Sequence, residues 1–244
     1  MKSFKLAKYN IKSSLKSIII YYIIFIGALT CIEMTNKFSN GGDGYTKGLE
    51  FSSVVFLFVI GLNFFKENFH FAQANNITRV DYFKAAAIAI LSIGLAMSIL
   101  DVIINRVYNI FMVSPTMYDM AYNESYSVGT VWIQSSSMQA LFGTVTFLFA
   151  GYIVAFAIGL LITMIYYKCN KIMKILVSLI PIAIYGRAAC NNPDLGEKEM
   201  IFIDKILGIS TRNSYMAVLT FICLFIITMV FIYLLVRKAV VKRV

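Results

Sequence analysis

The sequence has 244 residues, of which 59% are hydrophobic and 14% are charged, with a formal net charge of +10. A soluble domain carries about 25% charged residues, so this chain cannot cover a water-facing surface, in agreement with its mean hydropathy of +0.77. The composition therefore predicts an all-α membrane protein with several membrane-spanning helices. The positive charge is typical of basic residues held on the cytoplasmic side of a membrane rather than of nucleic-acid binding.

Residues 1–17 predict an amphipathic helix that lies along the membrane surface ahead of the first span. Lys5, Lys8, Lys12 and Lys16 recur on one helical face, and apolar side chains lie on another. We expect these four lysines to contact the lipid headgroups; a solvated basic tail is the alternative. No small-x-small cleavage site follows the next apolar run, so we interpret that run as a membrane helix and not as a signal peptide.

Six apolar segments predict six transmembrane helices in a single transmembrane domain, 1–244. Their approximate bounds are 18–34, 49–65, 83–104, 138–167, 172–186 and 214–236. The segment 66–82, between the second and third spans, is polar and rich in aromatic residues. It is longer than a minimal helix–helix turn, and we interpret it as a docking element.

The distribution of basic residues predicts that both termini are cytoplasmic, because basic residues mark the inner side. Of the 12 acidic residues, only Glu67 and Asp81 fall in the segments that would then face the cytoplasm. Most of the 22 basic residues fall there, namely Lys2, Lys5, Lys8, Lys12, Lys16, Lys66, Arg79, Lys84, Lys168, Lys171, Lys174, Arg237, Lys238, Lys242 and Arg243.

The sequence offers no clear set of catalytic or metal-binding residues. The glycine-rich segment 41–48 departs from the nucleotide-binding pattern G-x-x-x-x-G-K-[ST]. His70 is the single histidine, so a paired-histidine metal site cannot be built within the chain, and we interpret it as a contact residue. We expect no enzyme activity and no cofactor in this chain.

The charged side chains and the cysteines of the predicted spans also give no clear sign of a catalytic or metal-binding site. Asp101 lies at the far end of the third span, where its charge can reach the interface. The absence of a clear mid-span charge argues against a proton- or sodium-coupled carrier. The cysteines Cys31, Cys169, Cys190 and Cys223 are scattered, which favours free thiols, although a pair between Cys31 and Cys190 stays open.

The segment before the third span carries a family resemblance. Asn76-Ile77-Thr78-Arg79-Val80-Asp81-Tyr82-Phe83 resembles the glycine-(Ile/Val)-Ser-Arg-x-x-(Phe/Tyr)-Phe stretch of ABC-2 type exporter permeases, with Asn76 in place of glycine and Thr78 in place of serine. The arrangement of six spans after a basic amphipathic helix resembles the same family over nearly the whole chain. The compact size and basic ends resemble its exporters of amphipathic peptides, such as phenol-soluble modulins.

The resemblance implies a coupling helix in 66–82 that docks into a separate cytoplasmic ABC ATPase, which would bind ATP and Mg²⁺. Two permease chains, expected to be identical, would act with two ATPase chains in a bacterial plasma membrane to export an amphipathic peptide. We expect the phenylalanines to anchor the ATPase, the polar residues to supply hydrogen bonds, and the arginine to pair with an acidic rim or with phospholipid. These coupling residues are Phe69, His70, Phe71, Gln73, Asn75 and Arg79.

The expected cargo path lies between the two permease chains, along the second and fifth spans, at Phe56, Asn63 and Pro181. Without a nucleotide motif in this chain, the energy for transport must come from a partner. The alternative from another class is a membrane scaffold, or a bacteriocin-immunity or sensing subunit, that binds a cytoplasmic partner and transports nothing.

Overall fold

The computed structural model describes residues 2–40, 46–122, 137–169 and 201–237, and these residues contain helices but no strand. The helices are α1 (Lys2–Asn40), α2 (Phe51–Ala74), α3 (Arg79–Tyr108), α4 (Met117–Tyr122), α5 (Met138–Lys168) and α8 (Ser214–Arg237). The predicted all-α class is confirmed for this part of the chain.

Five of these helices, α1, α2, α3, α5 and α8, are long and apolar enough to cross a membrane. The chain is therefore a multi-pass membrane protein. The predicted segment 172–186 lies outside the described residues, as do Pro181 and Cys190, so the count of six spans stays a prediction. Cys31, Cys169 and Cys223 are free thiols.

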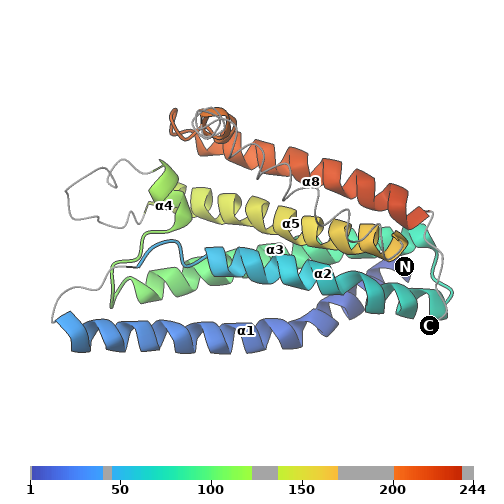
Figure 1. Ribbon diagram of the computed structural model, residues 1–244, viewed down its shortest axis with the longest axis horizontal. Coiled ribbons are helices and arrows are strands. Elements are labelled where there is room, and N and C mark those ends of the chain that lie inside the picture. The colour runs from blue at the N-terminus through green and yellow to red at the C-terminus, as the bar shows by residue number, and fades with distance from the viewer. Residues whose placement is uncertain (1, 41–45, 123–136, 170–200, 238–244) are drawn as a thin grey trace.

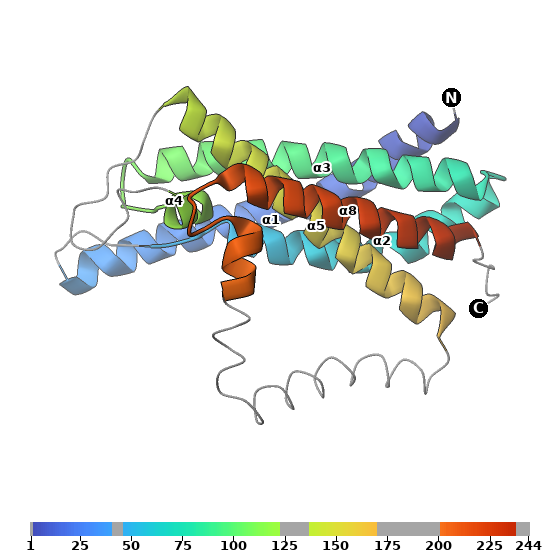
Figure 2. The ribbon, with the colours of Figure 1, turned by 90° about the horizontal axis from the view of Figure 1, so that it is seen from above.

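The long helices run along one axis of the molecule, with α5 at its centre between α2 and α8 (Figure 1). In the most apolar window of α5, 56% of the residues are buried, against 11% in α1, which lies at the edge of the bundle. The amino-terminal end of α1, the α2–α3 turn and the carboxyl-terminal end of α8 lie at one end, and α4 lies at the other (Figures 1 and 2). We call the first of these the basic end because exposed basic side chains gather there: Lys5, Lys8, Lys12, Lys16, Lys66, Arg79, Lys84, Lys168 and Arg237.

Helices α2 and α5 cross in backbone contact because each has a glycine at the crossing. A Cβ atom on Gly61 would lie 2.2 Å from the carbonyl oxygen of Phe156, and one on Gly159 would lie 2.2 Å from that of Phe58. The hydroxyl of Thr163 donates to the carbonyl of Leu62 at 2.5 Å. Small residues and a hydroxyl are the usual means of close helix packing in membranes.

Helix α1 is continuous across the boundary expected between the surface helix 1–17 and the span 18–34. It bends near its amino-terminal end (Figure 1). Lys5, Lys8, Lys12 and Lys16 are all exposed, so the lysine face inferred from the helical spacing is present on this helix.

The segment 66–82 does not contain a separate helix between α2 and α3, so the expected coupling helix is not confirmed. Residues 66–74 continue α2, and α3 begins at Arg79. The extension has a tertiary reason: Phe65, Asn68, Phe69 and Ala72 are buried, and their spacing keeps one face of α2 in the core. The connection between the helices is accordingly only the turn 75–78.

Candidate functional site

The turn between α2 and α3 is fixed by short-range hydrogen bonds. Asn75 Nδ2 donates to the carbonyl of Phe71 at 2.8 Å, and Asn76 adopts a left-handed conformation with φ of +52°. Thr78 is the N-cap of α3, since its hydroxyl accepts from the backbone N–H of Asp81 at 3.1 Å and donates to the Asp81 carboxylate at 2.8 Å. The turn therefore presents a defined surface at the basic end.

Phe69 is not part of that surface. Its side chain is 0% exposed and packs edge-on against Tyr82 and Tyr167, with ring centroids 5.4 and 6.4 Å away. The stacked ring of Phe65 completes the cluster. Phe69 thus holds α2, α3 and α5 together, and the role of partner anchor that the sequence suggested for it does not fit this position.

Phe71 lies on the opposite side of α2 and is 38% exposed. Its ring stacks on Tyr9 of α1 with centroids 4.0 Å apart and planes 9° from parallel. This stack joins the end of α2 to the first turns of α1, and part of the ring stays accessible at the basic end.

The other expected coupling residues contact the neighbouring parts of α2, α5 and the turn. His70 is half-buried and lies edge-on to Tyr167, at 6.5 Å between ring centroids. Gln73 donates to the carbonyl of Ile77 at 3.4 Å, and Asn75 is exposed. Gln73 and Asn75 therefore use side-chain donors to hold the turn.

Arg79 has a partner within the chain. Its guanidinium donates to the carbonyl of Arg237 at 2.6 Å, at the carboxyl end of α8. A cation at the carboxyl end of a helix satisfies a terminal carbonyl and complements the helix dipole. The arginine thus ties α3 to α8.

A groove between α1 and α2 brings together two of the three expected cargo-path residues, Phe56 and Asn63. It has a volume of about 370 Å³. Its lining is mixed: hydroxyls come from α1, and rings, aliphatic groups, amides and one carboxylate come from α2. The lining residues are Ser13, Ser14, Ser17, Phe56, Val59, Ile60, Asn63, Phe64, Glu67 and Asn68.

The two walls of this groove are held by aromatic contact. Phe56 stacks on Tyr21 of α1, with centroids 4.0 Å apart and planes 11° from parallel. The side chain of Asn63 is exposed and donates to the carbonyl of Val59 at 2.9 Å. A groove with apolar and polar sides suits an amphipathic ligand better than a purely apolar one.

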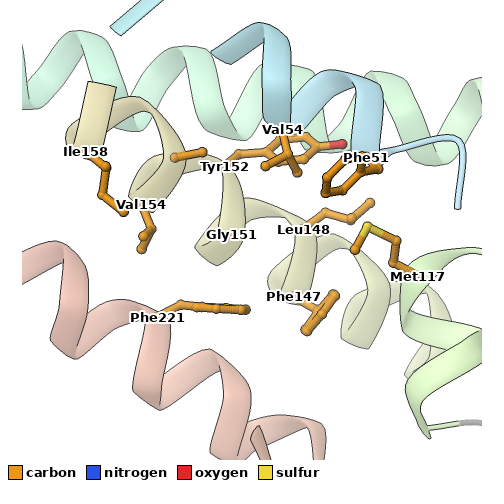
Figure 3. A pocket seen from close by; sticks show the side chains of 11 residues that line it. Phe51, Val54, Met117, Phe147, Leu148, Gly151, Tyr152, Val154, Ile158 and Phe221 are labelled. Carbon is orange, nitrogen blue, oxygen red and sulfur yellow. The ribbon is translucent and has the colours of Figure 1, made fainter. Parts of the chain in front are cut away.

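A second pocket lies between α2, α5 and α8, with Met117 of α4 at one end (Figure 3). It has a volume of about 270 Å³ and an almost wholly apolar lining, which includes Phe51, Phe147 and Phe221. Such a lining suits an apolar chain but offers little for polar recognition.

Asp101 is buried inside the bundle, at 3% exposure, so its carboxyl group is not exposed as expected. Its carboxylate accepts from the hydroxyl of Tyr22 in α1 at 2.8 Å and from that of Tyr152 in α5. An acidic residue in an apolar run is itself a signal of function. Its tyrosine partners could not be inferred from the sequence because they lie far from Asp101 along the chain.

Glu50, directly before α2, is a second buried acid that the sequence did not single out. It is 2% exposed, and its Oε2 accepts from the backbone N–H of Met117 at 3.4 Å. Burial, with smaller contributions from the carboxylates of Asp101 and Asp119, raises the pKa of Glu50 to about 7.

In the part of the chain with described side chains, no group of three or more His, Cys, Asp or Glu residues could hold a metal ion. Comparisons of the sequence with family models and curated proteins, and of the fold with solved structures, find no match.

Proposed function

We propose that this chain is the permease subunit of an ATP-driven ABC-2 exporter that moves amphipathic or hydrophobic peptides out of a bacterial cell. The proposal takes its class from the sequence resemblance. The observation that carries it further is the Phe71–Tyr9 stack, which links the α2–α3 turn to the helix that forms one wall of the α1–α2 groove.

In this proposal the basic end faces the cytoplasm of a bacterial plasma membrane, with both termini inside. The ATPase, which binds ATP and Mg²⁺, docks on the exposed part of the turn, at Phe71 and Asn75. Lys5, Lys8, Lys12 and Lys16 hold α1 at anionic headgroups. A second copy of the permease completes the cargo path.

The stack supplies a physical route for coupling. Motion of the docked partner acts on Phe71, and Phe71 acts on Tyr9 through a ring contact at 4.0 Å. Tyr9 lies one helical turn before Ser13, the first α1 residue in the groove. A shift of α1 therefore changes the width of the groove and the exposure of Phe56 and Asn63 to a bound peptide.

The test is reconstitution of the permease with its copurified ATPase in lipid vesicles, with an amphipathic helical peptide as cargo. Replacing Phe71 or Tyr9 by alanine is expected to lower peptide export per ATP hydrolysed by about tenfold, because it removes the ring contact between the end of α2 and the α1 wall of the groove. Phe38→Ala is the matched control, since Phe38 is 93% exposed and lies near the opposite end.

Two results would contradict the proposal. Export at the wild-type ratio in both stack variants would remove the coupling route. A complex that hydrolyses ATP but moves no peptide in the wild-type form would instead identify a scaffold, immunity or sensing subunit.

A further inference from the structure

Two acidic side chains line one small cavity in the helix bundle. The cavity lies in the part of the molecule away from the basic end. Glu50 and Asp101 line it together with Asn105, Phe25, Leu49 and Ile104. Its volume of about 10 Å³ is room for about one water molecule. The cavity is distinct from the α1–α2 groove and shares no residue with it.

The two carboxyl groups have unequal surroundings. Both oxygens of Asp101 accept hydrogen bonds from tyrosine hydroxyls, and Ser53 adds a third hydroxyl. Glu50 Oε1 is buried and has no hydrogen-bond partner. The Asp101 carboxyl group thus has a hydrogen-bond donor at each oxygen, whereas Glu50, which lines the same cavity, has one oxygen without a donor.

Glu50 Oε1, which has no hydrogen-bond partner, needs either a proton or a hydrogen-bond donor. A buried carboxylate oxygen without a hydrogen bond is costly, and a second carboxylate beside the same cavity adds repulsion. A proton on Glu50 Oε1 relieves both, because it neutralises the group and converts the oxygen into a donor. A water in the cavity can then accept from it.

We propose that Glu50 and Asp101 form a buried site that binds a single proton, with Glu50 as the group that gains and loses it. On binding, a hydronium ion at the cavity transfers its proton to Glu50 Oε1 and leaves as water. Binding thereby neutralises the Glu50 carboxylate beside Asp101. Glu50 is the last residue of the segment 46–50, which precedes α2. The site therefore lies at the end of the molecule away from the basic end.

The groups that face Glu50 come from several elements. Asp101 of α3 and Asp119 of α4 act on it as carboxylates, and Tyr152 of α5 interacts with both acids of the pair. Tyr22 of α1 reaches the site through Asp101. Arg106 interacts with Asp119. The raised pKa of Glu50, about 7, allows the proton to exchange near neutral pH.

The proton site is independent of any ATPase, so it is tested on the purified permease in nanodiscs. Infrared difference spectra recorded from about pH 5 to about pH 9 follow the carbonyl band of protonated carboxyl groups. The wild-type protein is expected to lose one buried carboxyl band with a midpoint near pH 7, and Glu50→Gln is expected to remove this transition.

The matched variants separate the pair from the rest of the protein. Asp101→Asn removes the like charge and is expected to shift the Glu50 midpoint down by about one unit. Glu67→Gln, on an exposed glutamate of α2, is expected to leave the transition unchanged. Tyr152→Phe removes one hydroxyl donor to Asp101 and is a second way to shift the midpoint of the Glu50 transition. Thermal unfolding of each variant at about pH 6 shows whether it is folded.

Three outcomes would overturn the proposal. The first is the absence of a buried carboxyl band in the wild-type protein below the midpoint. The second is a transition that persists in folded Glu50→Gln. The third is loss of the band on adding Na⁺ at constant pH, which would identify a sodium site in place of a proton site.

Discussion

Asn76 shows how one backbone angle shapes the α2–α3 turn. Its φ of +52° lies in the left-handed region, which glycine enters without strain and asparagine enters more readily than other residues. The exporter motif that this segment resembles has glycine at the same place. Asparagine is thus a residue type that fits the backbone of this turn at the position where the motif has glycine.

The neighbouring phenylalanines Phe69 and Phe71 differ in what they touch. Phe69→Ala is expected to lower the free energy of unfolding by about 3 kcal/mol or more, because it opens a cavity among Phe65, Tyr82 and Tyr167. Phe71→Ala is expected to change it by less than about 1 kcal/mol, because its ring is partly exposed. Thermal unfolding in detergent measures both, and equal losses would contradict the assignment.

Glu50 predicts a stability that depends on pH. Its folded-state pKa is raised from 4.5 to about 7, so the folded protein binds the proton more tightly than the unfolded chain. The stability contribution is fully present below about pH 4.5 and is lost as the pH rises through about 7. The total loss is about 3 kcal/mol.

Glu50→Gln keeps the shape of the side chain without the titration. It is expected to be more stable than wild type above neutral pH and to show a flatter stability curve between about pH 5 and about pH 8. Unfolding temperatures over this range in detergent measure the difference. A wild-type protein that gains stability over the same interval relative to Glu50→Gln would contradict the sign.

At the level of elements, α2 connects the α1–α2 groove, the crossing with α5 and the basic end. It lines the groove with Phe56 and Asn63, crosses α5 at Gly61, and carries Phe71 at the basic end. Because α2 runs unbroken from Phe51 to Ala74, a displacement of its end is transmitted along its length.

The α2–α5 crossing predicts that its glycines tolerate no side chain. Gly61→Ala and Gly159→Ala are each expected to destabilise the protein by about 2 kcal/mol, since the new methyl group meets backbone oxygen. Gly151→Ala is the matched control on α5, because a Cβ there meets nothing within 4 Å. Thermal unfolding in detergent compares the three, and a neutral Gly61→Ala would contradict the packing.

At the scale of the whole molecule, most exposed lysine and arginine side chains of the described residues lie at the basic end, with Lys47, Lys205 and Arg212 as the exceptions. The positive-inside rule predicts that this end is cytoplasmic. In a cysteine-free background, Asn75→Cys at the basic end is expected to resist a membrane-impermeant thiol reagent in intact cells, and Lys47→Cys at the other end is expected to react. Both side chains are exposed, so the reverse pattern would invert the orientation.

The sequence by itself determined the helical class and most of the span positions, because a long apolar run has few alternatives in a bilayer. It also grouped Phe56 with Asn63, and both line the α1–α2 groove. It could not show that residues 66–74 continue α2, since their polarity indicated a loop and only burial of Phe69 and Ala72 explains the helix.

Only the tertiary structure decided which side chains meet. Phe69 and Phe71 are two residues apart and read alike in sequence, yet one fills the core and the other faces α1. Asp101 is 79 residues from Tyr22 and 51 from Tyr152. Local patterns fix helices because helix hydrogen bonds are local, whereas a buried charge is stabilised by partners that the fold brings together.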